Sequence, residues 1–175
     1  MDRDSGYESI VLGGGCFWCT EAFFRAVAGV VTVTPGYAGG FVPNPTYREV
    51  CDGATGHAEV VEVEYDSREL SLEDVLEVFF ASHDPTSLNR QGADVGTQYR
   101  SIILYSDDEQ RKRVEEFISR IAGDHDRPIV TEVKRLERFY PAEEYHHRYF
   151  ERNPDQPYCR MVIAPKLAKL GKRAG

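Results

Sequence analysis

Positive charge is scarce in this chain of 175 residues, which has 29 Asp and Glu against 21 Lys and Arg and a net charge of −8. Broad nucleic-acid binding needs a basic face, so we expect no nucleic-acid partner. No apolar run approaches the roughly 20 residues that span a bilayer, so we expect no membrane association. The opening MDRDSGYES is acidic and polar rather than signal-like, which predicts a cytoplasmic protein.

Cysteine is also scarce, with residues at 16, 19, 51 and 159 only. Four scattered cysteines are too few for a disulfide framework in a chain of this size, so they are expected to be catalytic, metal-binding or buried. Cys16 and Cys19 form a CxxC pair, which is typical of a redox pair or of half a zinc site. A second CxxC or an HxxxH is missing, so we expect no metal.

The composition is that of a folded domain, with 41% hydrophobic and 29% charged residues. Periodicity and turn residues predict strands at 8–15, 30–34, 57–66, 99–106 and 128–139 and helices at 19–29, 71–83, 106–123 and 141–153. This order predicts an α+β fold, a plait-like two-layer sandwich with a βαββαβ core, an additional C-terminal helix and an irregular tail. We expect one catalytic domain over 1–175, with flexible ends at 1–7 and 166–175.

Two local patterns support these elements. Val61, Val63 and Tyr65 alternate with acidic residues, which predicts a half-buried strand. Ser71 is followed three positions later by Asp74, which resembles a capping box at the start of a helix.

The stretch GGGCFWCTEAFF places Cys16 where a strand ends and a helix begins. A helix N-terminus carries partial positive charge, which favours a thiolate and makes Cys16 a candidate nucleophile. The glycines would let another molecule approach the backbone. The alternative is a tight turn holding a small buried residue. Phe17 and Trp18 are adjacent, so both cannot face the core, and at least one ring is expected to be open to an apolar ligand; core packing is the alternative.

Glu59 lies at the mouth of a predicted strand. There it is either a solvated edge residue or a buried carboxyl whose raised pKa lets it hold and donate a proton at neutral pH. His57, in a glycine-rich turn, is expected to be structural. Tyr47, Asp94 and Tyr99 lie in two long polar loops, where a tyrosine hydroxyl binds a ligand or merely covers the surface.

Taken together, five blocks and the ending NPDQPYC resemble the peptide methionine sulfoxide reductase A family: GGGCFWCTEAFF, GYAGG, TYREVCDGATGHAEVVEVEYD, HDPTSLNRQGADVGTQYRS and PAEEYHHRYF. They run in order over nearly the whole chain. The resemblance implies reduction of the S epimer of methionine sulfoxide, free or in oxidised proteins. It implies Cys16 as nucleophile, Glu59 as proton donor and a substrate pocket made by Phe17, Trp18, Tyr47, Asp94 and Tyr99.

The resemblance also implies that a second thiol resolves a Cys16 sulfenic acid and that an external dithiol, a thioredoxin-like protein or dithiothreitol, reduces the disulfide. Cys159 is the favoured resolving cysteine, in a segment expected to be mobile. Cys19, where the family often has glycine, is the alternative, and Cys51 is expected to be buried and inert. We expect a monomer with no bound cofactor. A general thiol-disulfide oxidoreductase and a non-enzymatic methionine-binding or redox-sensing module are the competing hypotheses.

Overall fold

The computed structural model describes residues 6–174, with side chains described as far as residue 169. The elements in chain order are β1 (Tyr7–Gly13), α1 (Phe17–Arg25), β2 (Val30–Ala38), α2 (Tyr47–Cys51), β3 (Ala58–Asp66), α3 (Leu72–Ala81), β4 (Arg90–Gln91), β5 (Asp94–Val95), β6 (Ile102–Tyr105), α4 (Asp108–Ile121), β7 (Glu132–Arg135), β8 (Phe139–Pro141), α5 (Tyr149–Arg152) and α6 (Ala164–Ala174). Single 3₁₀ turns lie at Thr97–Tyr99, Ala122–Asp124 and Glu144–His146, and a π-helical turn at Cys159–Ile163.

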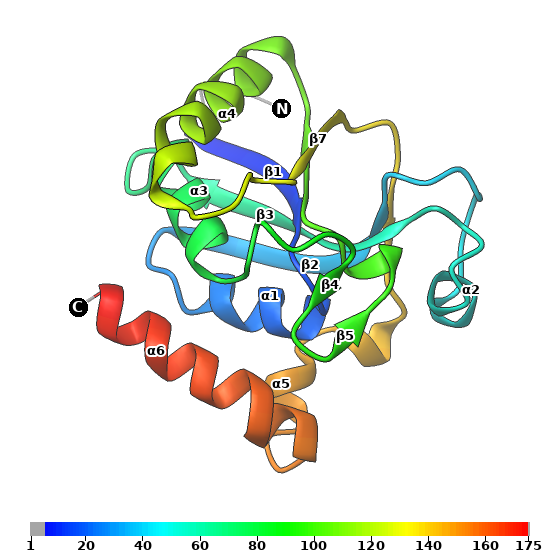
Figure 1. Cartoon of the computed structure of the whole chain (residues 1–175). Helices are drawn as coiled ribbons and strands as arrows, with labels where there is room; N and C mark the ends of the chain where they lie inside the picture. Colours follow the sequence, from blue (N-terminus) through cyan, green and yellow to red (C-terminus); the bar gives the residue numbers. More distant parts are fainter. Residues whose placement is uncertain (1–5, 175) are drawn as a thin grey trace.

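The main sheet is mixed and curled, with the order β7-β6-β1-β3-β2-β8 (Figure 1). Its strand pairs are antiparallel except for β6 and β7, which are parallel. A separate hairpin joins β4 to β5. The chain is therefore a mixed α/β structure in which helices pack on a sheet, and at this level the sequence prediction is confirmed.

One face of the sheet carries the larger core. Side chains from β1, β2, β3 and β6 pack there against α1, α3 and α4, among them Leu12, Val61, Phe79 and Phe117. The opposite face holds a smaller cluster that includes Val60 and is covered by Leu136 and Phe139. The predicted alternation in β3 is confirmed, because Val61, Val63 and Tyr65 are fully buried while the glutamates between them are half-buried.

The predicted capping box is also confirmed. The Ser71 hydroxyl accepts the Asp74 N–H at 3.0 Å, and the Asp74 carboxylate accepts the Ser71 N–H at 3.1 Å. Such caps stabilise a helix by about 1 kcal/mol. They fix the start of α3, whose far end reaches the β4–β5 hairpin beside the site.

The last third of the chain differs from the sequence prediction. The single strand expected at 128–139 is two strands, β7 and β8, at opposite edges of the sheet. The helix expected at 141–153 is a 3₁₀ turn and the short α5, separated by Arg148 with a φ of 56°. These elements are set by distant partners rather than by local periodicity, so their patterns were misleading.

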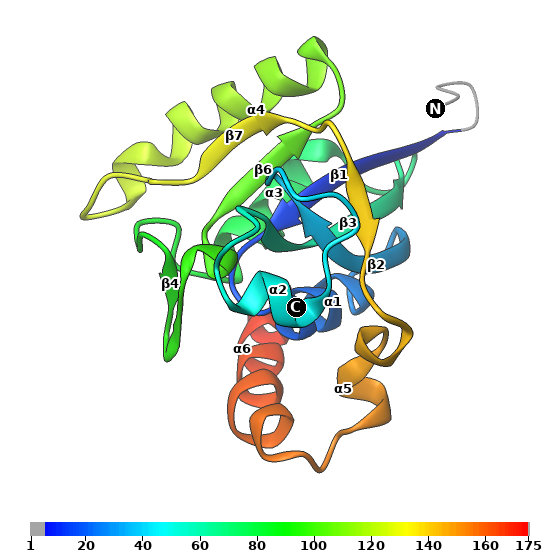
Figure 2. The same cartoon turned by 90° about the vertical axis from the view of Figure 1, so that its right-hand side faces the viewer.

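The irregular tail expected at 166–175 is helical as far as Ala174; residue 175 and residues 1–5 lie outside the described part. Helix α6 is stabilised by its apolar side, where Leu167 packs with Ile163 and with Phe23 of α1. Figures 1 and 2 both place α5 and α6 beside α1. Tyr7, expected in a flexible end, belongs to β1. Over residues 6–174, none of the helices combines the length and apolarity needed to cross a bilayer.

Candidate active site

Cys16 lies between β1 and α1, as the sequence predicted. It is the N-cap residue of α1, and its carbonyl accepts the N–H groups of Cys19 at 3.0 Å and Thr20 at 3.3 Å. The sequence predicted that the preceding glycines let a ligand approach the backbone, but in the structure side chains of this chain fill the space beside them. A Cβ at position 14 would lie 2.9 Å from the ring of His83, and one at Gly15, where φ is +102°, would lie 3.1 Å from Gln91. The glycines therefore allow side chains of this chain to pack against the turn.

The two thiols of the CxxC pair are in contact. Burial, a hydrogen bond donated to Cys19 and the charge of Glu59 raise the pKa of Cys16, whose side chain is 9% exposed. The Trp18 N–H at the helix start lowers that pKa, but by less. The lowered pKa predicted for the Cys16 thiol is therefore wrong, because burial outweighs the effect of the helix N-terminus.

Cys19 is the thiol with the lowered pKa. The hydrogen bond from Cys16 is the main cause, opposed by burial and assisted by the Tyr158 hydroxyl and by Lys166. A thiolate on Cys19 is thus stabilised by its neighbour, and the Cys16 proton has an acceptor close at hand.

Glu59 is buried, with 1% of its surface exposed, as required of a proton donor. Its Oε1 accepts the Phe17 N–H at 3.1 Å, which places the carboxyl at the start of α1 beside Cys16. Burial raises the pKa of Glu59 to about 8, with smaller contributions from the charges of Asp94 and Cys19, against the opposing Phe17 N–H. At pH 7 this carboxyl therefore holds its proton.

The two aromatic residues after Cys16 divide as predicted. Phe17 is buried, with its ring 5.6 Å from that of Tyr37. Trp18 is only partly buried. Its indole Nε1 donates to His146 Nδ1 at 3.0 Å, and its ring stacks on Tyr149 with centroids 3.7 Å apart and planes 6° apart. Trp18 is thus the ring available to an apolar ligand, and it is held at its edge and on one face.

Tyr47 and Tyr99 lie around the same carboxyl. Tyr47 begins α2, where its ring is stacked on Phe17 at 6.4 Å, and Tyr99 ends a 3₁₀ turn. Burial, followed by the charge of Glu59, raises the pKa of both tyrosines. Both hydroxyls are therefore neutral hydrogen-bond donors at pH 7.

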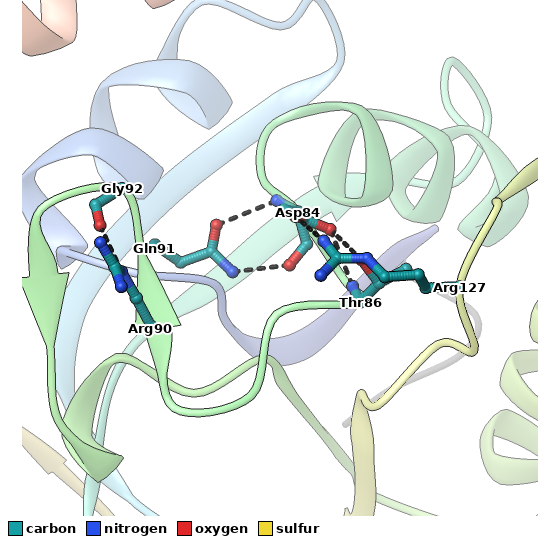
Figure 3. A network of polar contacts seen from close by, with 6 residues as sticks. All are labelled: Asp84, Thr86, Arg90, Gln91, Gly92 and Arg127. Carbon is teal, nitrogen blue, oxygen red and sulfur yellow. Dashed lines mark hydrogen bonds and ion pairs between the residues drawn. The ribbon is translucent and has the colours of Figure 1, made fainter.

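Asp94 is brought to the site by the β4–β5 hairpin, where its Oδ2 accepts the Tyr158 hydroxyl at 2.7 Å. Figure 3 shows how the hairpin is fixed to the end of α3. The Gln91 amide accepts the Asp84 N–H at 2.9 Å and donates to the Asp84 carbonyl at 2.7 Å. Asp84 is tied in turn to Thr86 and, at 3.2 Å, to Arg127.

Cys159 is fully buried in a cluster with Cys16, Cys19, Phe23 and Ile163. The segment expected to be mobile forms a π-helical turn, in which Cys159 packs beneath α1, and the preceding tyrosine binds Asp94. The Tyr158 hydroxyl also lies 3.5 Å from Cys19 Sγ.

Cys51 is exposed, so the expectation that it is buried is wrong. It ends α2, a short helix whose outer side faces solvent, one turn after Tyr47.

Sequence reasoning gave no role to three residues that line this region: His146, Tyr149 and Tyr158. His146 is fully buried, and burial lowers its pKa to about 4, so it is neutral. Its Nε2 has no partner among the described residues. The motifs YHHRYF and PYC contain these residues, and only their presence in blocks shared with a family signalled a role. His57 is structural as expected, since its ring nitrogens contact the Gly40 N–H and the Val42 carbonyl.

Within the described part of the chain, no three His, Cys, Asp or Glu side chains are grouped so that they could hold a metal ion. The site instead offers two thiols in contact, a carboxylic acid protonated at neutral pH and neutral hydroxyl donors. Thiols so placed give up electrons by forming sulfenic acid or disulfide. The fold and the site thus define a thiol-dependent oxidoreductase.

The family model for peptide methionine sulfoxide reductase matches residues 8–174. Peptide methionine sulfoxide reductase MsrA of Natronomonas pharaonis is 63% identical over 158 residues, 89% of each chain. That of Saccharolobus solfataricus is 56% identical over 165 residues, 94% of this chain and 93% of the other. The chain therefore belongs to the peptide methionine sulfoxide reductase family.

Solved structures agree with this assignment. Reduced Mxr1 from Saccharomyces cerevisiae has a TM-score of 0.84 at 35% identity, covering 89% of this chain and 90% of its own. The complex of Mxr1 with Trx2 has a TM-score of 0.61 at 26% identity, covering 83% of this chain and 86% of its own.

Proposed function

We propose that this protein reduces the S epimer of methionine sulfoxide, free or in oxidised proteins, to methionine. The observation that carries the proposal is the placement of Cys16 at the start of α1 beside Glu59, a buried carboxyl with a raised pKa. Attack on a sulfoxide sulfur needs a nucleophile, and its oxygen needs a proton. These two groups supply both.

In the proposed reaction Cys16 passes its proton to Cys19 and attacks the sulfoxide sulfur as a thiolate. This attack forms a bond between the two sulfur atoms. Glu59 gives its proton to the sulfoxide oxygen, which then moves to the Cys16 sulfur as both its bond to the substrate sulfur and the sulfur–sulfur bond break. Methionine leaves, and Cys16 is a sulfenic acid. The sulfoxide sulfur has gained the two electrons that the cysteine sulfur has lost.

The pocket residues fix the orientation of the substrate. Tyr47 and Tyr99, both neutral donors, would bind the sulfoxide oxygen, and such bonds strengthen as negative charge develops on it. Trp18, with Phe17 behind it, would contact the substrate methyl. Asp94 would hold this side of the pocket through Tyr158.

The sulfenic acid would then condense with a second thiol, releasing water and forming a disulfide. Cys159 is our proposed resolving cysteine and Cys19 the alternative. Burial of Cys159 in one cluster with Cys16 supports the first. The hydrogen bond between Cys16 and Cys19 supports the second.

An external dithiol would return the disulfide to two thiols. We propose a thioredoxin-like protein, on the support of the yeast relative's complex with Trx2. No bound cofactor is needed, because the dithiol supplies both electrons. We further propose that the chain acts in the cytoplasm as a monomeric single catalytic domain.

The core is proposed to be a split βαβ plait. The strand order β6-β1-β3-β2, with antiparallel neighbours, supports this interpretation. Helix α1 connects β1 to β2 and α3 connects β3 to β6. In this topology the start of α1 and the start of β3 meet, which places Cys16 beside Glu59.

The proposed function is tested by reaction with racemic methionine sulfoxide and excess dithiothreitol. The R epimer would direct its oxygen at apolar surface and leave the tyrosine donors unpaired, at a cost of about 1–3 kcal/mol for each group. We expect chiral chromatography after exhaustive reaction to show only the R epimer left. Equal consumption of both epimers would contradict the proposal, and so would binding of the sulfoxide without formation of methionine. An insulin-reduction assay distinguishes this function from that of a general disulfide reductase, which would reduce insulin.

A further inference from the structure

Helix α1 contains a second buried carboxylate, Glu21, that the proposed chemistry does not use. Its side chain is in the interior, with 2% of its surface exposed. Its Oε1 accepts the Arg148 N–H at 2.8 Å, and the carboxylate also interacts with the Tyr149 N–H. A buried carboxylate is costly unless it is hydrogen-bonded. The Arg148 N–H, more than 120 positions along the chain, is its largest compensation, ahead of the charges of Arg25 and His147 and of the Tyr149 N–H.

The backbone that Glu21 binds is in an unfavourable conformation. Arg148 has φ 56° and ψ 35°, the left-handed region that side-chain-bearing residues rarely adopt. Strained backbone of this kind persists where surrounding contacts hold it in place. The hydrogen bond from Arg148 to Glu21 is such a contact, and it sets the direction in which the chain enters α5.

The same side of α1 contacts this segment at two further positions. Trp18, one turn before Glu21, stacks on Tyr149. Arg25, one turn after it, forms an ion pair with Glu151 at 2.9 Å. The ion pair is partly exposed and contributes little in water, so the buried carboxylate is the stronger of the two polar contacts.

We propose that Glu21 is a positioning residue: it anchors the backbone at Arg148 and Tyr149 and thereby holds residues 148–163 against α1. This seats Tyr149 on the Trp18 ring and keeps Tyr158 and Cys159 beside Cys19. The consequence for turnover rests on the proposed function, because the residues held in place are Trp18, which would contact the substrate methyl, and Cys159, the proposed resolving cysteine. The anchoring itself is a property of the reduced protein without substrate.

The test compares Glu21→Ala and Glu21→Gln with two controls, Glu151→Ala and Arg148→Gly. Two measurements are made on the reduced enzyme. The first is backbone hydrogen exchange in residues 148–163, with β3 as the reference segment. The second is fluorescence of Trp18, the only tryptophan. We expect Glu21→Ala to speed exchange in 148–163 about tenfold or more, to leave β3 unchanged and to shift Trp18 emission to the red. Glu21→Gln, which keeps an acceptor oxygen, should show a smaller effect.

Both controls should match the wild type. Glu151→Ala removes only the exposed ion pair. Arg148→Gly keeps the backbone donor and adopts the left-handed conformation freely. With racemic sulfoxide, Glu21→Ala should raise KM because Trp18 loses its support, whereas Arg148→Gly should not.

Two results would overturn the inference. One is unchanged exchange and emission in Glu21→Ala; the other is exchange that accelerates equally in β3 and in 148–163, which indicates general destabilisation. If Glu21→Ala does not fold, the same comparison is made with Glu21→Gln, and wild-type values there count against the proposal. Because exchange and emission need no turnover, a failure of the proposed reductase function leaves this test intact, and its own failure leaves the reductase assay intact.

Discussion

At the scale of single residues, environment rather than residue type distinguishes the roles that we propose for chemically identical side chains. Glu59 and Glu21 are both buried carboxyls on or against α1. Burial, with smaller contributions from the charges of Asp94 and Cys19, raises the pKa of the first against one opposing backbone N–H, so it stays protonated at neutral pH. The second is bound to backbone at Arg148 and serves as an anchor. Sequence patterns gave Glu59 two alternatives, because burial of one side chain depends on neighbours from distant segments.

Replacing Cys16 with serine should abolish methionine formation while leaving the fold intact. Serine keeps the N-cap position, which it favours, but its hydroxyl is not nucleophilic at this pH without an activating base. Turnover with dithiothreitol and the circular dichroism spectrum are the two measurements. Cys51→Ser is the matched control and should retain activity, because that thiol is exposed at the end of α2 and serine can keep its hydrogen bond with the Tyr47 side chain. Turnover by Cys16→Ser would disprove the assignment of the nucleophile.

At the scale of elements, local sequence predicts what local contacts determine. The capping box of α3 and the alternation of β3 depend on residues that are close together in the sequence, and both were predicted. The chain after residue 128 is arranged by distant partners: β8 pairs with β2, α5 lies on α1, and α6 packs on the Cys159 cluster. Local periodicity does not indicate contacts with distant segments. One strand was therefore predicted where the structure has β7 and β8, and an irregular tail was predicted where it has α6.

Disulfide mapping can identify which element supplies the thiol that condenses with the Cys16 sulfenic acid. After reaction with one equivalent of sulfoxide and no reductant, we expect mass spectrometry to find a Cys16–Cys159 bridge, because the π-helical turn holds Cys159 in the same buried cluster. Cys159→Ser should then release one methionine but recycle poorly with a thioredoxin. A Cys16–Cys19 bridge, together with normal recycling by Cys159→Ser, would assign resolution to α1 itself.

At the scale of the whole molecule, the site requires nearly the full chain. The end of β1 and start of α1 supply the thiols, β3 supplies Glu59, α2 and the 97–99 turn supply tyrosines, and the C-terminal segment covers Trp18. Ordered motifs along the sequence predicted these residues as the site through a family resemblance. The order of the two thiol pKa values was not predictable, because it depends on burial and on the contact between Cys16 and Cys19.

The central claim is that protonated Glu59 delivers the proton to the sulfoxide oxygen. It is tested most directly by single-turnover methionine release across pH 5–10 in wild type and Glu59→Gln. A raised carboxyl pKa means that the acid form exists below it, so the wild-type rate should fall as the pH rises through about 8. Glu59→Gln should be slower by roughly 10²–10⁴ at pH 7 and should lose the break near pH 8. A Glu59→Gln rate within a few-fold of wild type, or an unchanged break, would contradict the account.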